Sequence, residues 1–316
     1  MPAIFALAPA KIILFGEHAV VYGRPAIAIP ITQLRAKAVI TPIPLSSPGI
    51  VIIEAPNIGL NSRLDDLPVG HPLREVVNIV TKTLMVSIPP SLKIRITSTI
   101  PMASGLGSGT AVSVAIIRAL SAYLGKPLPD QEVSDLAYQI EKIYHGTPSG
   151  IDNSVITFGK PVFFIRNQPI QFIEVAHPLA LIIGDTGVYS PTSKVVEKVH
   201  YSWEANPSHY ESMFDDIGAI TLKGKEAIQN GNSVILGQLL TQNHAILQEL
   251  GVSSPELDHL VKTALDAGAL GAKLSGGGQG GNMIALVEPG SISEIGHKLL
   301  ESGAVRTIET VIGKKE

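Results

Sequence analysis

Residues 101–120, PMASGLGSGTAVSVAIIRAL, place a glycine-rich loop between a strand-like segment and a helix-like segment. In the preceding segment, residues 92–98, apolar and polar side chains alternate, which predicts a half-buried strand. The following segment is largely apolar up to Gly125, which predicts a buried helix that ends at this glycine. Gly105 and Gly107 let the backbone approach a ligand, and the free N–H groups at a helix start attract an anion. This strand–loop–helix segment therefore either binds a phosphate or makes a tight turn in which the glycines merely permit packing.

Two well-known phosphate-binding motifs do not describe this loop. A Walker A loop requires a lysine after its last glycine, and no lysine follows Gly109. A dinucleotide-binding fingerprint that starts at Gly105 and Gly107 requires a third glycine where Thr110 stands. The role of the loop therefore has to be decided from the other motifs in the chain.

Length and composition limit the remaining choices. A chain of 316 residues exceeds the usual size of one core, which favours two domains. The 45% apolar and 16% charged residues are typical of a globular protein, and no run approaches the ~20 apolar residues of a membrane span. The N-terminal segment lacks the basic residues of a secretory signal and cysteine is absent, so we expect a cytoplasmic protein. A net charge of -3 provides no basic surface for nucleic acid or an anionic membrane.

The order of predicted elements indicates two domains of mixed helix and strand. Five β-like runs separated by Pro and Gly fill the first hundred residues, and a helix capped by Asp130 comes later. Strand patterns then resume, and two helices are predicted within residues 208–250. From Pro255 onward the pattern is helix, strand, glycine turn, strand, helix and strand, as in an α+β sandwich of ferredoxin type. We therefore expect domains over residues 1–158 and 159–316, with the option that the last strand returns to the first domain.

A second glycine-rich segment, KLSGGGQGGN at residues 273–282, offers another set of backbone donors. Gly276, Gly278 and Gly281 satisfy the pattern GxGxxG, but a strand-like segment rather than a helix follows, so the dinucleotide-binding context is missing. This segment is either a tight hairpin or one wall of a phosphate site.

Two further motifs carry ionisable residues. In HGTPSGIDN, Asp152 follows a turn and is a candidate general base or metal ligand, although aspartate is about equally common as a turn former. In AKIILFGEHAVVYG, near the N-terminus, Lys11 lies within an apolar strand, where the alternative is an edge lysine whose ammonium reaches solvent. Glu17 and His18 are either contacts to a polar substrate or ordinary loop residues.

Together the four motifs favour phosphoryl transfer, which depends on positioning and charge neutralisation more than on covalent chemistry. The two glycine loops would hold phosphates, the carboxylates would serve Mg²⁺ and a base, and the lysine would supply positive charge. In their order along the chain, the four motifs closely resemble those of the GHMP small-molecule kinases, over nearly the whole sequence. GEHAVVYG and HGTPSGIDN are most similar to the branch of that family that phosphorylates mevalonate.

The resemblance implies both a fold and an activity. The fold would be α+β, with an N-terminal domain of the type of ribosomal protein S5 domain 2 and a C-terminal ferredoxin-like domain. ATP and mevalonate would bind between the domains, and the product would be 5-phosphomevalonate, made by ATP-dependent phosphorylation of the C5 hydroxyl of (R)-mevalonate. This reaction belongs to the mevalonate pathway of isoprenoid biosynthesis. The resemblance also makes a homodimer reasonable.

Three residues match the catalytic and metal positions of the family. Asp152 matches the catalytic aspartate, which takes or orients the hydroxyl proton. Lys11 matches the lysine that stabilises the developing alkoxide and phosphoryl charge. Glu141 matches the glutamate that binds Mg²⁺, a cation that needs few protein carboxylates when phosphate oxygens complete its shell.

Other residues match the binding positions. The substrate side is expected to comprise Glu17, His18, Ser149, Gly150 and Thr192. The ATP phosphates are expected to lie against Ser104, Gly105, Leu106, Gly107, Ser108, Gly109 and Thr110.

One departure from the family concerns the metal. The family usually has the text GLGSSA, whose second serine offers a hydroxyl near Mg²⁺, and Gly109 stands in that place here. Ser108, Thr110 or water would have to replace this hydroxyl, and of these Ser108 is our candidate metal ligand. Gln279 also stands where glycine is common, which we expect to narrow the pocket slightly.

Two alternatives remain open at the level of sequence. One is a kinase of the same family for a related substrate, such as phosphomevalonate or another hydroxyl of mevalonate. The other is a ligand sensor on the same fold that binds ATP without chemistry. The joint presence of Lys11, Glu141 and Asp152 argues against a sensor, because ligand binding alone does not require all three.

Overall fold

The computed structural model describes residues 2–102, 104–145 and 148–313. Of these, residues 2–10, 32–102 and 106–159 form one compact unit, here called unit 1. Residues 11–31, 104–105 and 160–313 form a second, here called unit 2. Gly146 and Thr147 of the HGTPSGIDN motif lie outside the described residues.

The two units are not simple halves of the chain. Residues 11–31, which the sequence analysis assigned to the N-terminal domain, pack with unit 2. The reason is that two long strands, β1 (Ile4–Phe15) and β2 (Ala26–Pro42), each contribute residues to both units. The domain limits of 1–158 and 159–316 remain a prediction.

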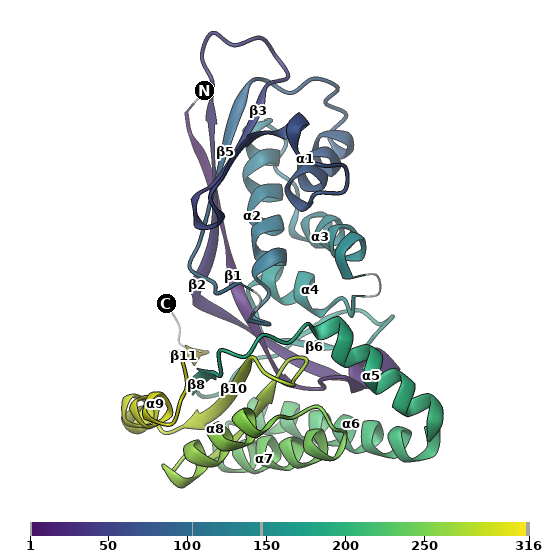
Figure 1. The fold of residues 1–316 in the computed structure, drawn as a ribbon, viewed down its shortest axis with the longest axis vertical. Helices are drawn as coiled ribbons and strands as arrows, with labels where there is room; N and C mark the ends of the chain where they lie inside the picture. Colours follow the sequence, from purple (N-terminus) through teal and green to yellow (C-terminus); the bar gives the residue numbers. More distant parts are fainter. Residues whose placement is uncertain (1, 103, 146–147, 314–316) are drawn as a thin grey trace. The chain divides into compact units, whose positions relative to one another are not determined.

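Unit 1 consists of a sheet with helices gathered on one side of its strands (Figure 1). The strand order in this part of the sheet is β4-β3-β5-β2, with β1 paired to β2. Strands β3 and β5 pair in parallel, whereas β3 pairs with β4 and β2 with β5 antiparallel. The remaining elements of unit 1 are β3 (Val51–Ala55), η2 (Pro56–Ile58), β4 (Leu60–Arg63), η3 (Leu64–Asp66), α1 (Pro72–Thr83), β5 (Leu92–Ser98), α2 (Ser108–Tyr123), α3 (Asp130–His145) and α4 (Ile151–Phe158).

Helix α2 lies at the centre of unit 1 and contacts α1, α3, α4 and β5. Its apolar residues are buried all round, as expected for a helix enclosed by other elements. The strand, glycine loop and helix predicted around Gly105 and Gly107 are therefore confirmed by β5, the loop and α2. Gly125 has a φ of 77° just after α2, as predicted for the residue that ends this helix.

Unit 2 contains a four-stranded antiparallel sheet in the order β11-β8-β10-β9. The N-terminal end of β2 pairs with β6, which pairs with β7. The further elements of unit 2 are η1 (Ala19–Tyr22), β6 (Val162–Phe164), β7 (Gln171–Phe172), β8 (Leu179–Asp185), α5 (Thr192–Ala205), α6 (Pro207–Asn230), α7 (Ser233–Glu249), α8 (Pro255–Asp266), β9 (Gly271–Ser275), β10 (Asn282–Val287), η4 (Pro289–Ser291), α9 (Ile292–Glu301) and β11 (Arg306–Ile312).

The α+β order predicted for the C-terminal part is confirmed by α8, β9, β10, α9 and β11. The option that the last strand returns to the first domain is wrong. Residues 306–312 pair along their whole length with β8, and the alternate side chains of Ile308, Thr310 and Ile312 are buried there.

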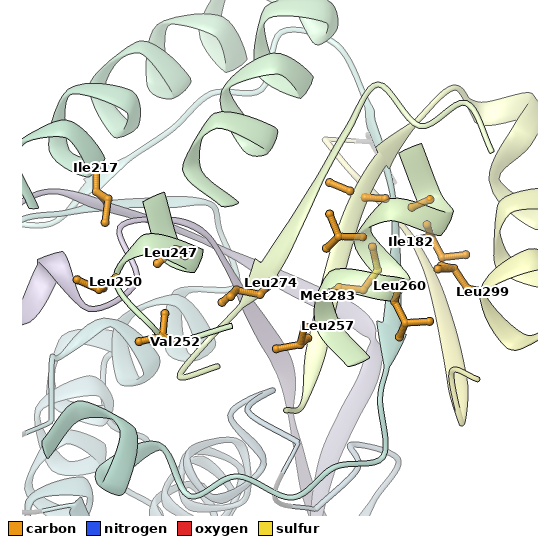
Figure 2. Close-up of a cluster of buried hydrophobic side chains, with 14 of the residues drawn as sticks. Ile182, Ile217, Leu247, Leu250, Val252, Leu257, Leu260, Leu274, Met283 and Leu299 are labelled. Carbon is orange, nitrogen blue, oxygen red and sulfur yellow. The ribbon is translucent and has the colours of Figure 1, made fainter. Parts of the chain in front are cut away.

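The main core of unit 2 lies between this sheet and the helices that cover it. Figure 2 shows Ile182, Leu274 and Met283 from three neighbouring strands, near Leu260 of α8 and Leu299 of α9. Side chains alternate between the two faces of a strand. Lys273, which separates two members of this cluster on β9, is therefore directed to the opposite face of the sheet.

Among the elements that differ from the sequence prediction are one strand and two helices. The two β-like runs RPAIAIPI and RAKAVITPI form one continuous strand, β2. Helices α1 and α5 were not predicted. In α1 the buried residues Leu73, Val76, Val77 and Val80 follow the helical period, so this helix carried a signal that was not used. In α5 only Val195 and Val199 are buried, so few residues mark a buried face.

Candidate active site

The predicted phosphate loop enters α2 through two glycines in the left-handed region. Gly105 has a φ of 78° and Gly107 a φ of 75°, and Gly107 is the N-cap residue of α2 without a side-chain capping bond. The first N–H groups of a helix have no partners within the helix, and the helix dipole places partial positive charge there. This loop can therefore receive the oxygens of a phosphate group.

A hydroxyl and a carboxylate meet in the first turn of this helix. The Thr110 hydroxyl donates a hydrogen bond to Oε1 of Glu141, which comes from α3. Both side chains are buried, with exposed fractions of 7% and 6%. Thr110 and Glu141, predicted as phosphate and metal residues respectively, are thus brought together.

Gly109, the departure from the family text, leaves room for a side chain. Its φ is not in the left-handed region, and a Cβ built there would meet no atom within 4 Å. Packing therefore does not require glycine at this position. Ser108, the first residue of α2, is half-buried.

Oxygen ligands suited to Mg²⁺ occur on these two helices. The carboxylate of Glu141 and the hydroxyls of Ser108 and Thr110 are hard donors of the kind that this cation prefers together with phosphate oxygens. In the described ranges, no three His, Asp or Glu side chains converge on one point. The residues fit a cation that is shared with a nucleotide.

Asp152 lies in the first turn of α4. Gly150 caps this helix with a φ of 90°, and the Ser149 hydroxyl accepts a hydrogen bond from the Ile151 N–H at 3.3 Å. The predicted substrate residues Ser149 and Gly150 thus form the turn that presents Asp152. The positive end of a helix dipole favours a carboxylate at this position.

Polar contacts, one of them fully buried, connect the three helices of this site. Asn153, next to Asp152, donates through Nδ2 to the hydroxyl of Ser134 on α3 at 2.9 Å. Arg118 of α2 donates to the Asp130 carboxylate and to the Thr157 carbonyl, each at 2.6 Å. Because α2, α3 and α4 carry Thr110, Glu141 and Asp152, these contacts limit how far the three residues can shift within unit 1.

In unit 2, Glu17 and Lys273 form an ion pair with no exposed side-chain surface. Burial raises the pKa of the Glu17 carboxyl and lowers the pKa of the Lys273 ammonium, while their mutual attraction opposes both shifts. Lys273 also donates to the Leu274 carbonyl at 2.6 Å. Glu17, predicted to contact substrate, therefore faces a lysine in the protein interior.

His18 and Thr192 meet at Gly277 in the second glycine loop. The His18 ring donates through Nε2 to the Gly277 carbonyl at 2.9 Å. Burial lowers the pKa of His18 to about 4, so the ring is neutral near pH 7 and Nδ1 carries no proton. Thr192 begins α5 and is exposed, and a Cβ built on Gly277 would lie 3.0 Å from its side chain.

The second glycine loop is packed tightly against two neighbouring segments of unit 2. A Cβ on Gly278 would lie 2.0 Å from the Val252 carbonyl oxygen, and one on Gly280 would lie 2.5 Å from the Val188 carbonyl oxygen. At its end, the Asn282 amide donates to the Ser104 carbonyl of the predicted phosphate loop.

Gln279 does not project into a pocket as expected. Its side-chain amide donates to the carbonyls of Gly251 and Ser253 at 2.9 and 2.8 Å, which directs it to the loop after α7. These bonds help to hold the residue at a φ of 58°, a conformation that glycine adopts more easily.

Lys11 is the remaining predicted site residue. It lies on β1 with an exposed fraction of 5%. An edge lysine whose ammonium reaches solvent would be more exposed, so the alternative raised from the sequence does not apply. Lys11 belongs to unit 2 and Asp152 to unit 1.

Several polar residues at this site received no role in the sequence analysis, namely Arg118, Ser134, Asn153, Lys273 and Asn282. A lysine between apolar residues in the strand GAKLS was a signal that could have identified Lys273. The others are common polar residues whose partners lie on other segments, 12 to 178 residues away in the sequence.

Comparison with known proteins gives matches in both halves of the chain. Residues 73–160 match the family described as GHMP kinases N terminal domain, and residues 225–305 match GHMP kinases C terminal. A mevalonate kinase of Pyrococcus horikoshii is 35% identical over 331 residues, covering 98% of this chain and 95% of that protein.

Solved structures of mevalonate kinases are also similar to this chain. The mevalonate kinase of Methanococcus jannaschii superposes with a TM-score of 0.84 at 28% identity, over 98% of both chains. The L. major mevalonate kinase in complex with R-mevalonate superposes with a TM-score of 0.81 at 30% identity, over 98% of this chain and 95% of that one. No helix in the described ranges is both long and apolar enough to cross a membrane.

Proposed function

The chain belongs to the GHMP kinases, and from this membership we propose that it transfers the γ-phosphoryl group of ATP to the C5 hydroxyl of (R)-mevalonate. The assignment of mevalonate as the substrate rests on the near full-length similarity to mevalonate kinases, including a structure with R-mevalonate. The two-domain GHMP fold expected from the sequence is confirmed. The product is 5-phosphomevalonate, and the reaction is a step of isoprenoid biosynthesis.

The transfer makes one bond and breaks one. The C5 oxygen bonds to the γ-phosphorus while the bond from that phosphorus to the β–γ bridging oxygen breaks, which releases ADP. Asp152, in the first turn of α4, orients the hydroxyl and takes its proton. Lys11 stabilises the negative charge that develops on the oxygen and the phosphoryl group.

We assign the binding of the ATP phosphates to the first glycine loop and the start of α2. Backbone N–H groups between Ser104 and Thr110 hold the phosphates of ATP without side-chain charge. Glu141 would hold Mg²⁺, with the hydroxyl of Ser108 or Thr110 in the place that Gly109 leaves without one. When bound, Mg²⁺ neutralises charge on the transferring phosphate.

On the substrate side, His18 and Thr192 are the contacts that the geometry supports. They meet at Gly277, and the neutral His18 ring offers Nδ1 as an acceptor for a hydroxyl group. Ser149 and Gly150 shape the turn before Asp152. Glu17 acts through its buried pair rather than by touching substrate.

A coupled assay of ADP release with ATP, Mg²⁺ and mevalonate tests this function. We expect turnover that depends on mevalonate and a product whose phosphorus NMR spectrum shows coupling to the C5 protons. A panel containing phosphomevalonate is the control for substrate class. Faster turnover with phosphomevalonate, phosphorylation of another hydroxyl, or no ADP release with any substrate would each contradict the proposal.

We also propose that the protein acts in the cytoplasm as a homodimer. Both proposed substrates are small polar molecules, which suits an enzyme of that compartment, and the family resemblance supports a dimer. Size-exclusion chromatography with light scattering should give twice the chain mass of 33.4 kDa. A mass of one chain at micromolar concentration would contradict the dimer.

A further inference from the structure

Lys273 and Glu17 form a buried pair that the proposed chemistry does not use. Both side chains are fully enclosed, and Lys273 is among the largest fully buried side chains of the described residues. Burying two charged groups costs desolvation free energy, and this cost cancels much of their mutual attraction. Such pairs therefore contribute little to stability. A function in positioning accounts better for an ion pair at this place.

The pair joins two segments that both contribute to the substrate side. Glu17 lies in the turn after β1, directly before His18, and Lys273 lies on β9, just before the second glycine loop. The same two segments are joined by the bond from the Ser275 hydroxyl to the Ile13 carbonyl at 2.7 Å. The His18 bond to Gly277 is a third connection between them.

His18 needs such support because its backbone is strained. Its φ of 60° with ψ of -50° lies outside the regions that a residue with a side chain prefers. Strained residues persist only where the surrounding contacts hold them, and a bulky side chain in this conformation is uncommon. The neighbouring Glu17 side chain is fixed inside the protein, which restricts the backbone that His18 shares with it.

Lys273 is itself held at several points. Its ammonium donates to the Leu274 carbonyl as well as to Glu17. The Leu274 N–H in turn donates to Nδ1 of the buried His244 at 3.3 Å. The lysine therefore acts as a fixed anchor rather than a mobile side chain.

We propose that Lys273 is a positioning residue for substrate binding, which through Glu17 holds His18 and the second glycine loop in the arrangement that receives mevalonate. The inference rests on the proposed function. It assigns no contact with substrate to either member of the pair, and it predicts that His18 transmits their effect.

The main experiment compares Lys273→Met with the double variant Glu17→Gln/Lys273→Met. The single variant leaves a buried carboxylate without its counter-charge, so its melting temperature should drop markedly. The double variant removes both charges and should recover most of the melting temperature. Its kcat/KM for mevalonate should nevertheless stay about tenfold to a hundredfold below the unmodified protein, because His18 is displaced. The KM for ATP should change less than about twofold.

A double-mutant cycle with His18→Ala tests the route of the effect. If the pair acts through His18, then adding Glu17→Gln/Lys273→Met to His18→Ala should lower kcat/KM for mevalonate by less than about twofold. If the fold losses in kcat/KM from His18→Ala and from Glu17→Gln/Lys273→Met multiply in the combined variant, the pair acts independently of His18 and the proposal is overturned.

Leu299→Ala serves as the control for stability. Leu299 is fully buried on α9, in the cluster on the other face of the sheet from Lys273, so its truncation should lower the melting temperature without changing KM for mevalonate. A double variant with unchanged kinetics would show that the ion pair is only structural. If the unmodified protein does not phosphorylate mevalonate at all, the proposed function fails, whereas an active protein with unaffected variants refutes only the role of Lys273.

Discussion

Replacing Thr110 by valine tests the metal-binding part of the site. The change exchanges a hydroxyl for a methyl group of similar size, so it removes the hydrogen bond to Glu141 without opening a cavity. A hydrogen bond to a charged group contributes about 1.5–3 kcal/mol. Because Glu141 is only 6% exposed, water cannot easily replace the lost donor.

Losing the free energy of this hydrogen bond should weaken the binding of Mg²⁺. If the Thr110 hydroxyl orients the Glu141 carboxylate toward the cation, or binds the cation itself, then 1.5–3 kcal/mol corresponds to about a tenfold to hundredfold weaker response to Mg²⁺. We therefore expect the Mg²⁺ concentration at half-maximal ADP release to rise by that factor in Thr110→Val. The assay is a Mg²⁺ titration at fixed ATP and mevalonate.

Two variants control this experiment. Thr110→Ser keeps the hydroxyl and should retain most of the Mg²⁺ response. Ser113→Ala removes another buried hydroxyl on the same helix, one whose hydrogen bond goes to the Gly109 carbonyl at 3.2 Å, and should leave the Mg²⁺ response unchanged. A half-maximal Mg²⁺ concentration in Thr110→Val within about twofold of the unmodified protein would refute the role given to this hydroxyl.

Three further predictions concern other parts of the site. Gly278→Ala should destabilise the protein by about 3–5 kcal/mol in chemical denaturation, from left-handed strain plus overlap with a backbone carbonyl. A Cβ at Gly276 would meet no atom within 4 Å, so Gly276→Ala should cost only about 1–2 kcal/mol of backbone strain. Equal losses of stability in the two variants would contradict this difference. Asn153→Ala should lower kcat about tenfold with unchanged KM for ATP, since Asp152 loses the support of the bond to Ser134; a kcat equal to that of the unmodified protein would exclude this role. Burial lowers the pKa of His244 from 6.5 to about 4, so the unfolded chain takes up a proton in this window and the folded protein does not. Between pH 6.5 and about 4 the free energy of unfolding should therefore fall by up to about 3 kcal/mol, and the decline should be smaller in His244→Gln; the same decline in both proteins would contradict the assignment.

Local sequence patterns predicted the parts of the fold that depend on local physics. The alternation before Gly105 and the apolar run after Gly107 indicated the strand, loop and helix that the structure contains. The C-terminal order of elements was equally readable, because helices α8 and α9 have a clear apolar face and strand β10 is a short run of mostly apolar residues. Helix α5, which buries only Val195 and Val199, was not predicted.

The pairings within the site could not be read from the sequence. Glu141 was assigned to the metal, but its partner Thr110 lies 31 residues away, on another helix. Glu17 was assigned to substrate because it matches a substrate-side position of the GHMP kinases, whereas the structure pairs it with a lysine 256 residues further along the chain. Such contacts depend on how β1 and β9 are brought together by the fold, which no local pattern encodes.

The central claim, that Asp152 activates the C5 hydroxyl of mevalonate, is tested most directly by Asp152→Asn. An amide keeps the shape of the side chain but cannot take the proton. We predict that this variant loses nearly all mevalonate-dependent ADP release in the coupled assay, while its affinity for ATP, measured by calorimetry, stays within about twofold of the unmodified protein. Unchanged turnover in Asp152→Asn would contradict the mechanism.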